Sequence, residues 1–411
     1  MIGMEASQKD GAWLPIPIIQ LNLDAPVEPA FDPRATHARV EVTRAGQVVG
    51  VFGTPVVKGR WASNTIDEAT RQYSGVATSV LMVDDDHLPT ISVVVPTIAV
   101  DLVELARTID SLLAIDYPRL EIVVVDNRTE AGNPLPDYSS DERIRFVEEP
   151  RRGISAARNR GIAATTGEIV AFTDDDVSVE PTWLRALGNC FALHPEVEGV
   201  GGLVMPRELD TQPQLWFEEF FGGFSRSFEA SLMSVSLTRT SDPMFPYAPG
   251  RFGAGCNMGF RRTSLERVGR FNQALGTGTP AKGGEDLAMF LELALSGATL
   301  AFEPAALVRH SHRKSEAAFM KQVFGYGVGL TAMYSALIAR DPRRLGGVLA
   351  RVPHGLRLLS KPRVERSTII TPTYPRRCHA RQLLGMTYGP VAYAQSIAAA
   401  RRPSYSSDER V

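Results

Sequence analysis

Short apolar runs that alternate with helical patterns constrain the fold of this chain of 411 residues more than any other feature. The runs at 91–95, 122–125 and 169–172 are almost wholly apolar, which is typical of parallel strands that are covered on both faces of a sheet. Between the first two runs, the apolar residues of 102–113 recur at helical spacing after Asp101, which can cap a helix N-terminus. This alternation predicts an α/β fold with a doubly wound, mostly parallel sheet.

Carboxylates stand directly after two of these predicted strands. They are Asp126 after the second run and Asp174, Asp175 and Asp176 after the third. In doubly wound sheets ligands bind beyond the carboxyl ends of the strands, so we expect these side chains to meet at one site. Adjacent carboxylates repel one another, and their position after a buried strand indicates a bound cation. Because side chains alternate along an extended segment, Asp174 and Asp176 lie on the same side of it. One of these carboxylates can then bind a metal while the other accepts a hydrogen bond from a ribose hydroxyl.

A second acidic pair, Glu285-Asp286, follows two glycines and opens an apolar helical pattern. Acidic residues are favoured in the first turn of any helix, so the pair alone would indicate only helix-start chemistry. Together with the upstream aspartates, it indicates a carboxylate that can take a proton from an attacking hydroxyl. His310 and His312 alternate, so they share one face of a strand. A lone histidine is more often structural than a ligand, and we single out His310 as the candidate metal ligand.

Six short motifs follow one another along the chain. They are Val94-Val95-Pro96-Thr97, Val124-Val125-Asp126-Asn127, Arg158-Asn159-x-Gly161, Asp174-Asp175-Asp176, Gly284-Glu285-Asp286 and His310. No single motif is decisive, but the ordered set resembles the family 2 glycosyltransferases, which have the GT-A fold. The resemblance covers roughly residues 90–315.

The resemblance implies an inverting transfer of a sugar from a nucleotide-sugar donor, assisted by a divalent metal such as Mn²⁺ or Mg²⁺. It implies that the nucleotide sugar is held by Pro96, Thr97, Asp126, Arg158, Asn159, Asp174 and Asp175. It assigns the metal to Asp176 and His310 and the general base to Asp286, with Glu285 beside it as a second catalytic candidate. The chemistry of these groups agrees, because cations stabilise a departing diphosphate and one base without an enzyme nucleophile gives inversion.

Two other functions compete with this interpretation. A sugar-phosphate nucleotidyltransferase would share the nucleotide-binding architecture, but it is expected to carry a glycine-rich, basic loop where this chain has residues 96–101 with neither feature. A non-catalytic relative that binds nucleotide sugars would have no chemical need to keep Asp174, Asp176 and Asp286 together. The sequence leaves open the donor sugar, the nucleotide and the acceptor, which we expect to be a glycan, a glycolipid or a small molecule.

We divide the chain into three parts. Residues 1–88 form an appendage, in which a hairpin is predicted around Ala45-Gly46 and a helix from Thr65 to about residue 80. Residues 89–315 form the GT-A domain, and residues 316–411 form a helical, basic extension.

Three local patterns have simpler explanations than a site. The aspartate triplet at 84–86 follows no buried strand and is interpreted as a solvated linker. Thr263-x-x-Glu266 predicts a capping box at the start of a short helix. The aromatic cluster at 216–221 could stack on an acceptor, but core packing is the safer interpretation.

The net charge of −2 conceals a basic C-terminal segment, since residues 340–411 contain 14 Lys/Arg and 4 Asp/Glu. This segment fits a solvated pair of basic helices and a peripheral contact with an anionic membrane equally well. The charge-free segment 322–339 is polar enough that we expect an interfacial or buried helix there.

The location and the remaining partners follow from what the sequence contains. The three cysteines show no metal-type spacing, and no secretory pattern stands at the N-terminus. We therefore expect a reducing, cytoplasmic location, with the inner face of the cell membrane as the alternative. No nucleic-acid recognition motif accompanies the basic segment, so no nucleic-acid partner is expected. The chain also has no Gln-x-x-Arg-Trp segment, which favours the addition of one or a few sugars over polymer extrusion.

Overall fold

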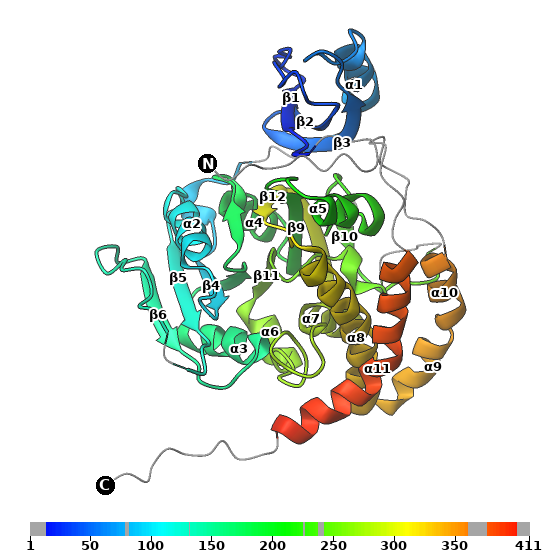
Figure 1. Cartoon of the computed structure of the whole chain (residues 1–411). Coiled ribbons are helices and arrows are strands. Elements are labelled where there is room, and N and C mark those ends of the chain that lie inside the picture. The colour runs from blue at the N-terminus through cyan, green and yellow to red at the C-terminus, as the bar shows by residue number, and fades with distance from the viewer. Residues whose placement is uncertain are drawn as a thin grey trace.

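A computed structural model describes residues 14–78, 82–130, 132–224, 227–236, 242–360 and 376–400. A nine-stranded sheet forms its centre, with the strand order β10-β12-β9-β11-β7-β4-β5-β6 and with β8 paired to β12 (Figure 1). The strands are β4 (Ile91–Thr97), β5 (Leu120–Asp126), β6 (Ile144–Glu148), β7 (Ile169–Phe172), β8 (Val177–Val179), β9 (Val197–Pro206), β10 (Ser231–Met233), β11 (Met258–Arg261) and β12 (Thr299–His310).

Helices cover both faces of this sheet. Side chains alternate along each strand, so apolar residues project from both faces and the helices bury them. On one face, α2 (Leu102–Leu113) and α4 (Trp183–Leu193) pack on residues such as Val93 of β4. On the other face, Val94 belongs to a hydrophobic cluster that includes residues of three other helices. These are α3 (Ile154–Ala164), α6 (Arg262–Val268) and α7 (Glu285–Leu295). The predicted doubly wound α/β arrangement is confirmed.

Strand direction explains where a site can form. The neighbours β7, β4, β5 and β6 are parallel, and so are β9 and β12. Between these two groups, β11 runs antiparallel to both β7 and β9. The carboxyl ends of β4, β5 and β7 therefore meet at one edge of the sheet, as the sequence predicted.

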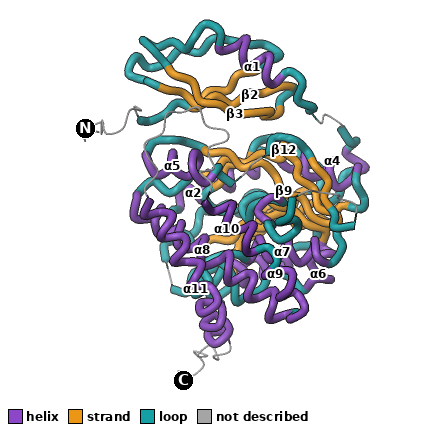
Figure 2. The backbone as a smooth tube through the Cα atoms, turned by 90° about the vertical axis from the view of Figure 1, so that its right-hand side faces the viewer, coloured by secondary structure: helices purple, strands orange, loops and turns teal. Residues whose placement is uncertain are grey.

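The N-terminal part forms its own small sheet of β1 (Ile18–Asn22), β2 (His37–Arg44) and β3 (Gln47–Pro55), which lies beside β12 (Figure 2). Ala45 and Gly46 have φ angles of 48° and 75°, so the predicted hairpin turn is confirmed. The helix α1 (Thr65–Tyr73) ends earlier than predicted, and residues 79–81 lie outside the described part.

The C-terminal part is helical, as predicted. It contains α8 (Glu316–Arg340), α9 (Leu345–Leu349), α10 (Val352–Ser360) and α11 (Arg376–Ala400). Glycines let α8 and α11 approach closely, because a Cβ added at Gly327 would lie 2.1 Å from the Gln382 carbonyl oxygen. In the described part of the chain, α8 is the one helix long and apolar enough to cross a membrane, and half of its apolar window is buried inside the protein.

The local patterns have mixed outcomes. The aspartates at 84–86 lie at an exposed one-turn helix, η1 (Asp85–His87), which agrees with a linker. The capping box at Thr263 is wrong, because α6 begins one residue earlier and Arg261 occupies the N-cap position. A capping box instead opens α5 (Gln212–Trp216), where Thr211 and Gln214 form it. The boundaries proposed for the three parts of the chain stay a prediction.

The aromatic cluster continues α5 as a π-helical turn, η2 (Phe217–Phe221). Trp216, Phe217 and Phe221 pack with Phe319 and Val323 of α8. This contact agrees with the interpretation of these aromatic side chains as core.

Candidate active site

The ends of β4, β5 and β7 bring the predicted nucleotide-binding residues together. Thr97 is the register partner of Asp126, and the Thr97 hydroxyl donates a hydrogen bond to Asp175 Oδ2 at 2.6 Å. Pro96 precedes Thr97 at the end of β4. Asp126 accepts hydrogen bonds from Arg128 Nε and Nη2 at 2.8 and 2.5 Å. The Thr97 contact joins the aspartate triplet to the end of β4, where Thr97 pairs with Asp126 of β5.

Arg158 lies at the centre of the site and is 1% exposed. It projects from α3, and its Nη1 donates to Glu285 Oε1 at 2.7 Å. Its Nη2 donates to Asp174 Oδ1 and to the Gly255 carbonyl oxygen, each at 3.1 Å. A guanidinium with several donors can thus hold the buried Glu285 carboxylate and the partly exposed Asp174 carboxylate at one point.

The Glu285-Asp286 pair opens α7, as predicted. Asp286 Oδ2 accepts a hydrogen bond from the Gly255 backbone N–H at 2.9 Å. Gly284 precedes the pair with a φ of 86°, and a Cβ there would lie 2.4 Å from the Gly329 carbonyl oxygen of α8. The glycines before the pair therefore allow α8 to support the loop that presents the carboxylates. Glu285 is buried, whereas Asp286 is partly exposed.

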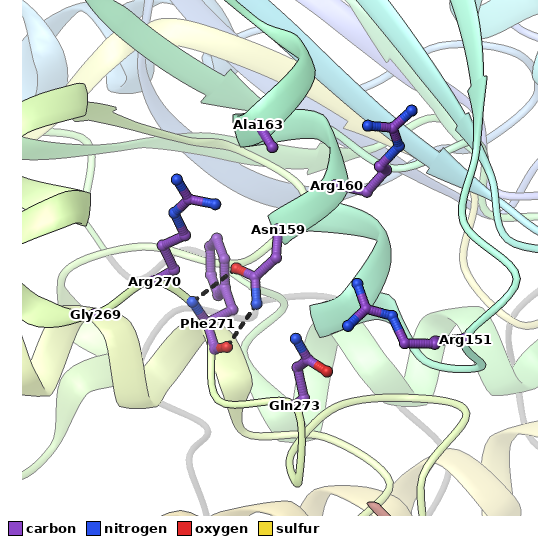
Figure 3. Close-up of a pocket in the computed structure, with 8 residues that line it drawn as sticks. All are labelled: Arg151, Asn159, Arg160, Ala163, Gly269, Arg270, Phe271 and Gln273. Carbon is purple, nitrogen blue, oxygen red and sulfur yellow. Dashed lines mark hydrogen bonds between the residues drawn. The ribbon is translucent and has the colours of Figure 1, made fainter. Parts of the chain in front are cut away.

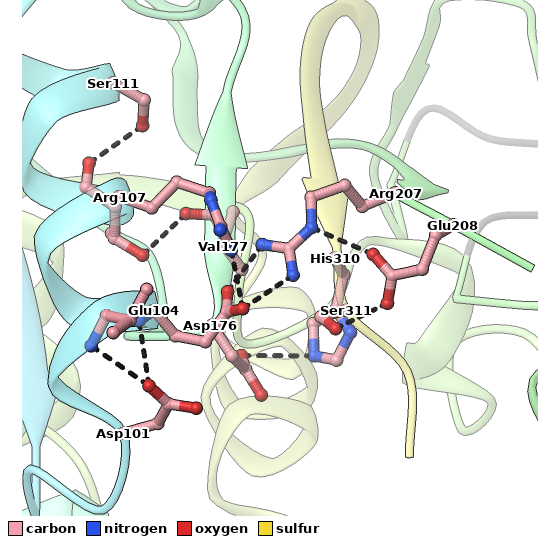
Figure 4. Close-up of polar contacts among 12 residues, drawn as sticks. Asp101, Glu104, Arg107, Ser111, Asp176, Val177, Arg207, Glu208, His310 and Ser311 are labelled. Carbon is pink, nitrogen blue, oxygen red and sulfur yellow. Dashed lines mark hydrogen bonds and ion pairs between the residues drawn. The ribbon is translucent and has the colours of Figure 1, made fainter. Parts of the chain in front are cut away.

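The two candidate metal ligands lie beside each other (Figure 4). His310 Nε2 is 3.4 Å from Asp176 Oδ1, because β8 follows Asp176 directly and pairs with the end of β12. Arg313 lies on the other side, with Nη1 3.8 Å from Asp176 Oδ2. Among the residues that the structure describes, no group of three or more histidine, cysteine, aspartate and glutamate side chains is arranged to hold a metal. Asp176 and His310 remain the two candidate ligands that the sequence predicted.

Charged neighbours hold this end of the sheet in place (Figure 4). Arg207 Nη1 donates to Glu104 Oε2 of α2 at 2.6 Å, and Arg207 Nε donates to Glu208 Oε2 at 2.9 Å. Glu208 also accepts a hydrogen bond from the Ser311 hydroxyl at 2.7 Å. The segment after β9 is therefore tied both to α2 and to the residue that follows His310.

Burial changes the ionisation of the site. It raises the pKa of Asp174 and Asp176, and it raises that of Asp175 to about 7. Burial, followed by the charge of Asp286, raises the pKa of Glu285 to about 7. Burial also lowers the pKa of His310 to about 3, so its ring is neutral at pH 7. Several carboxylates and a neutral imidazole therefore lie close together at this end of the sheet.

Asn159 is hydrogen-bonded to the backbone of Phe271, in the loop after α6 (Figure 3). Its amide accepts a hydrogen bond from the Phe271 N–H at 3.0 Å and donates to the Phe271 carbonyl oxygen at 2.8 Å. It lines a cavity of about 500 Å³ together with Arg151, Arg160 and Arg270. Its predicted role in binding the nucleotide sugar stays a prediction, because the structure shows it clamping the backbone at Phe271.

Sequence reasoning gave no role to two residues that shape the site. Asn127 donates to the Glu149 and Arg151 carbonyl oxygens, each at 2.7 Å, and accepts from the Gly153 N–H, so it fixes the approach to α3. Its place after Asp126 at a strand end was a usable signal. Glu218 also escaped attention, because its contact with His312 spans 94 positions and leaves no local pattern.

The chain is similar in sequence to a known family and to several named proteins. The model of the family described as "Glycosyl transferase family 2" matches residues 92–269. The succinoglycan biosynthesis protein ExoM of Rhizobium meliloti is 31% identical over 267 residues, which cover 62% of this chain and 74% of that protein. A glucosyl-dolichyl phosphate glucuronosyltransferase of Haloferax volcanii is 30% identical over 193 residues, which cover 45% of this chain and 57% of that protein.

Two further proteins are more distant or matched over less of their length. The pre-mycofactocin glycosyltransferase of Mycobacterium tuberculosis is 31% identical over 47% of this chain and 38% of its own length. A solved mannosyltransferase of Pyrobaculum calidifontis, in complex with GDP-Man and Mn²⁺, is 18% identical, covers 80% of each chain and has a TM-score of 0.44. The match to the family model and to most of the ExoM sequence shows that this chain belongs to glycosyl transferase family 2.

Proposed function

We propose that the chain transfers a sugar, with inversion, from a nucleoside-diphosphate donor to an acceptor hydroxyl, and adds one or a few sugars rather than extruding a polymer. One observation carries the proposal. Arg158 joins Asp174, from the strand end on which the donor would lie, to Glu285, which stands beside the proposed base Asp286. A single displacement at the sugar carbon requires the donor and the base to be held close together, and the contacts of Arg158 do this.

The nucleotide is proposed to bind over the ends of β4 and β5. Asp126 lines a cavity of about 610 Å³ together with Arg128, Leu135 and Tyr138. A carboxylate beside an aromatic and an apolar side chain can accept hydrogen bonds from a base or a ribose and pack against its faces. Thr97, which contacts Asp175, would link this cavity to the aspartate triplet.

The metal is proposed to be held by Asp176 and His310. A neutral imidazole and a carboxylate 3.4 Å apart are ligands that Mn²⁺ accepts, and Mg²⁺ in particular usually completes its shell with water and substrate phosphates. Two protein ligands therefore fit a metal that is shared with a diphosphate. When bound, such a metal would neutralise the charge on the leaving diphosphate.

Asp286 is proposed to take the proton of the acceptor hydroxyl. It is the more exposed member of its pair, and the Gly255 N–H fixes one carboxylate oxygen. Glu285 is buried against Arg158, so its role would be to hold that arginine and Asp174 in place. With Asp286 as the base, direct attack of the acceptor hydroxyl on the sugar would give inversion.

The acceptor is proposed to be a glycan, a glycolipid or a small molecule. The names of the relatives support each class, because they refer to succinoglycan, to glucosyl-dolichyl phosphate and to pre-mycofactocin.

The test is the melting temperature of the protein with a panel of nucleoside diphosphates, with and without Mn²⁺. A ligand that binds only the folded state raises the melting temperature. We expect a shift with one nucleotide that requires Mn²⁺ and that Asp176→Ala removes. A shift that is equal with and without metal would reject the metal site, and the absence of a shift with any nucleotide would reject the donor site.

We also propose that the C-terminal helices lie against an anionic membrane at its cytoplasmic face. Four exposed apolar residues follow one another at helical spacing along α9 and α10. They are Leu345, Leu349, Val352 and Leu356. The segment that carries them is strongly basic, and an apolar stripe with basic neighbours suits anionic headgroups.

Sedimentation with lipid vesicles tests this contact. We expect binding to vesicles of phosphatidylcholine mixed with phosphatidylglycerol and loss of binding in Leu349→Ser/Leu356→Ser. The matched control is Leu193→Ser, which changes a comparably exposed leucine at the end of α4. Equal sedimentation of both variants would contradict the proposed surface.

A further inference from the structure

Three arginine side chains surround the cavity of about 500 Å³ that lies beside α3 (Figure 3). They are Arg151, which precedes α3, Arg160, which lies within it, and Arg270, which follows α6. Among the described residues that line this cavity, none is acidic. A hollow lined by cationic side chains of this kind raises the local concentration of anions.

We propose that this arginine cavity binds a small, water-soluble molecule that carries a phosphate group. The proposal goes beyond the proposed function, because the cavity shares none of its described lining residues with the cavity proposed for the nucleotide. A guanidinium suits phosphate in particular, since its planar fork offers parallel N–H donors to two oxygens at once.

Two of the three arginines have no acidic partner. Arg151 is paired, because its Nε and Nη2 donate to the two carboxylate oxygens of Glu149 at 2.8 and 2.7 Å. Arg160 donates through Nε to the Glu148 carbonyl oxygen at 3.2 Å, which is a neutral acceptor. Within the described part of the chain, neither Arg160 nor Arg270 forms an ion pair. Their terminal N–H groups therefore remain available to an anion.

A fourth arginine increases the excess of positive charge. Arg262 donates to two backbone carbonyl oxygens and to the Thr165 hydroxyl, all of them neutral, at 2.8, 3.0 and 3.0 Å. Burial lowers the pKa of Arg262, and the charge of Arg270 lowers it further although two glutamates oppose this change. The two guanidinium groups thus repel each other, and an anion bound at Arg270 would relieve that repulsion.

The backbone at Arg270 is held in a conformation that arginine rarely adopts. Arg270 has a φ of 62° and directly follows Gly269, which has a φ of 94°. The N–H groups of both residues donate to the Leu265 carbonyl oxygen, at 2.9 and 3.1 Å, and end α6. Glycine is the residue that the left-handed region favours, and other residues held there are concentrated at functional sites. The chain thus keeps a guanidinium where the backbone alone would favour glycine.

One wall of the cavity is rigid before any ligand binds. Asn159 holds the N–H and the carbonyl oxygen of Phe271, which is 3% exposed. The Phe271 ring packs edge-on against Phe172 with centroids 5.2 Å apart, and the Arg158 guanidinium lies 5.6 Å from its centroid. A preorganised wall loses little conformational entropy when a ligand binds.

The lining indicates a soluble ligand rather than a lipid. Ala163 and Phe271 are the described lining residues with apolar side chains, and Phe271 is buried. None of the large exposed apolar side chains of the described chain belongs to the cavity. Gln273 is exposed at its edge and adds an amide donor. The cavity therefore offers hydrogen bonds and charge but no surface for an acyl chain.

Calorimetric titration of the full chain with pyrophosphate, in EDTA and at low salt, tests the proposal. Without Mn²⁺ the donor site lacks the cation that is proposed to hold a diphosphate, so binding under these conditions reports the arginine cavity. We expect one pyrophosphate per chain and an affinity that falls at least about tenfold in Arg270→Gly. Glycine adopts a φ of 62° without strain, so this variant keeps the fold. Arg160→Gln, at an exposed position of α3, should weaken binding in the same way.

Lys58→Gly is the matched control. Lys58 is exposed and has a φ of 51°, so this substitution also removes one positive charge from a left-handed backbone position, but outside the cavity. It should leave the affinity for pyrophosphate unchanged. Wild-type protein that binds no pyrophosphate, or equal weakening in Arg270→Gly and Lys58→Gly, would overturn the proposal.

Two further outcomes would also overturn it. Binding that appears only with Mn²⁺ and disappears in Asp176→Ala would locate the pyrophosphate in the donor site. Capture of the chain by phosphatidic acid vesicles through Arg270, without binding of pyrophosphate, would show that the phosphate belongs to a lipid headgroup. Failure of the arginine cavity would leave the proposed sugar transfer untouched, because no step of that transfer uses Arg160 or Arg270.

Discussion

At the scale of single residues, the candidate site depends most on Arg158. Its side chain is buried between Glu285 and Asp174, and no other cation is within hydrogen-bond distance of either carboxylate in the described part of the chain. Removal of one partner from a buried ion pair leaves an uncompensated charge, which is more costly than the pair itself is stabilising. The arginine therefore both maintains the fold and places the two acids.

We expect Arg158→Met to lower the free energy of unfolding by about 3–5 kcal/mol, because Glu285 and Asp174 lose their common partner. The measurement is urea unfolding at pH 7. Arg160→Met, on the exposed side of the same helix, is the control and should change stability by no more than about 0.5 kcal/mol. Equal losses in both variants would show that Arg158 is an ordinary helix residue.

Asp286→Asn should lower the turnover number by about 10²–10⁴-fold and leave the affinity for the donor nucleotide unchanged. The amide oxygen can still accept the hydrogen bond from the Gly255 N–H, whereas the contact of the other carboxylate oxygen with the Leu287 N–H is lost together with the base. Turnover and calorimetric binding of the nucleotide are measured together. Asp126→Asn should show the opposite pattern, with weaker nucleotide binding. Loss of nucleotide binding in Asp286→Asn would remove the aspartate from the base role.

The sequence predicted those residues that follow a recognisable element and missed those that act across the fold. Asp174, Asp176 and Asp286 stand at strand ends or helix starts, where local pattern and general rules locate them. Arg39 Nη2 lies 2.8 Å from Glu218 Oε2 although the two residues are 179 positions apart, and nothing in either neighbourhood indicates the other. Contacts of this kind depend on how the N-terminal sheet docks, which hydrophobic periodicity does not encode.

At the scale of elements, α8 connects the C-terminal helices to the site. Its Gly329 faces the Gly283-Gly284 turn, and a Cβ there would lie 2.9 Å from the Gly283 carbonyl carbon. On the same helix, a Cβ at Gly325 would find its nearest neighbour 3.8 Å away, at ordinary contact distance. The helix thus contains one glycine that the packing requires and another that it does not.

We expect Gly329→Ala to destabilise the protein and to lower turnover, because the added methyl group pushes the turn that carries Glu285 and Asp286. Gly325→Ala should instead stabilise the protein by about 0.5–1 kcal/mol, since alanine is the better helix former. Melting temperature and turnover are measured for both. Stabilisation by both substitutions would mean that α8 does not press on the turn.

The elements themselves were largely predictable, and the errors have local causes. The hairpin at Ala45-Gly46 and the cap at Asp101 were correct, because both depend on residues within a few positions. The capping box at Thr263 was wrong, because β11 runs directly into α6 and leaves Arg261 at the N-cap. The antiparallel insertion of β11 was not predicted, since strand direction is decided by tertiary pairing.

At the scale of the whole molecule, buried acids make stability depend on pH. Burial raises the pKa of Glu219 from its ordinary value of 4.5 to about 7. Burial is also the main reason why the pKa of Glu285 is raised to about 7. The folded chain therefore holds protons that the unfolded chain releases between about pH 4.5 and 7. These groups stabilise the fold fully below about pH 4.5 and lose that contribution as the pH rises through 7.

His310 acts in the opposite direction. Its pKa is lowered from 6.5 to about 3, so the unfolded chain takes up a proton that the folded chain does not, and stability falls as the pH drops below 6.5. The wild-type pH profile mixes both effects and cannot be assigned to one group. The contribution of one buried acid is obtained by subtracting the free energy of unfolding of its variant from that of the wild type at each pH.

Glu219→Gln supplies this difference, because Glu219 is 6% exposed and one of its carboxylate oxygens has no hydrogen-bond partner. We expect the variant to gain stability relative to the wild type by about 2–3 kcal/mol between pH 5 and pH 8, since it has no buried charge to form. Urea unfolding at both pH values measures it. Glu266→Gln, at an exposed position of α6, is the control. Its free energy of unfolding should differ from that of the wild type by the same amount at pH 5 and at pH 8. A constant difference for Glu219→Gln as well would mean that Glu219 is ionised in the fold and that its pocket contains water.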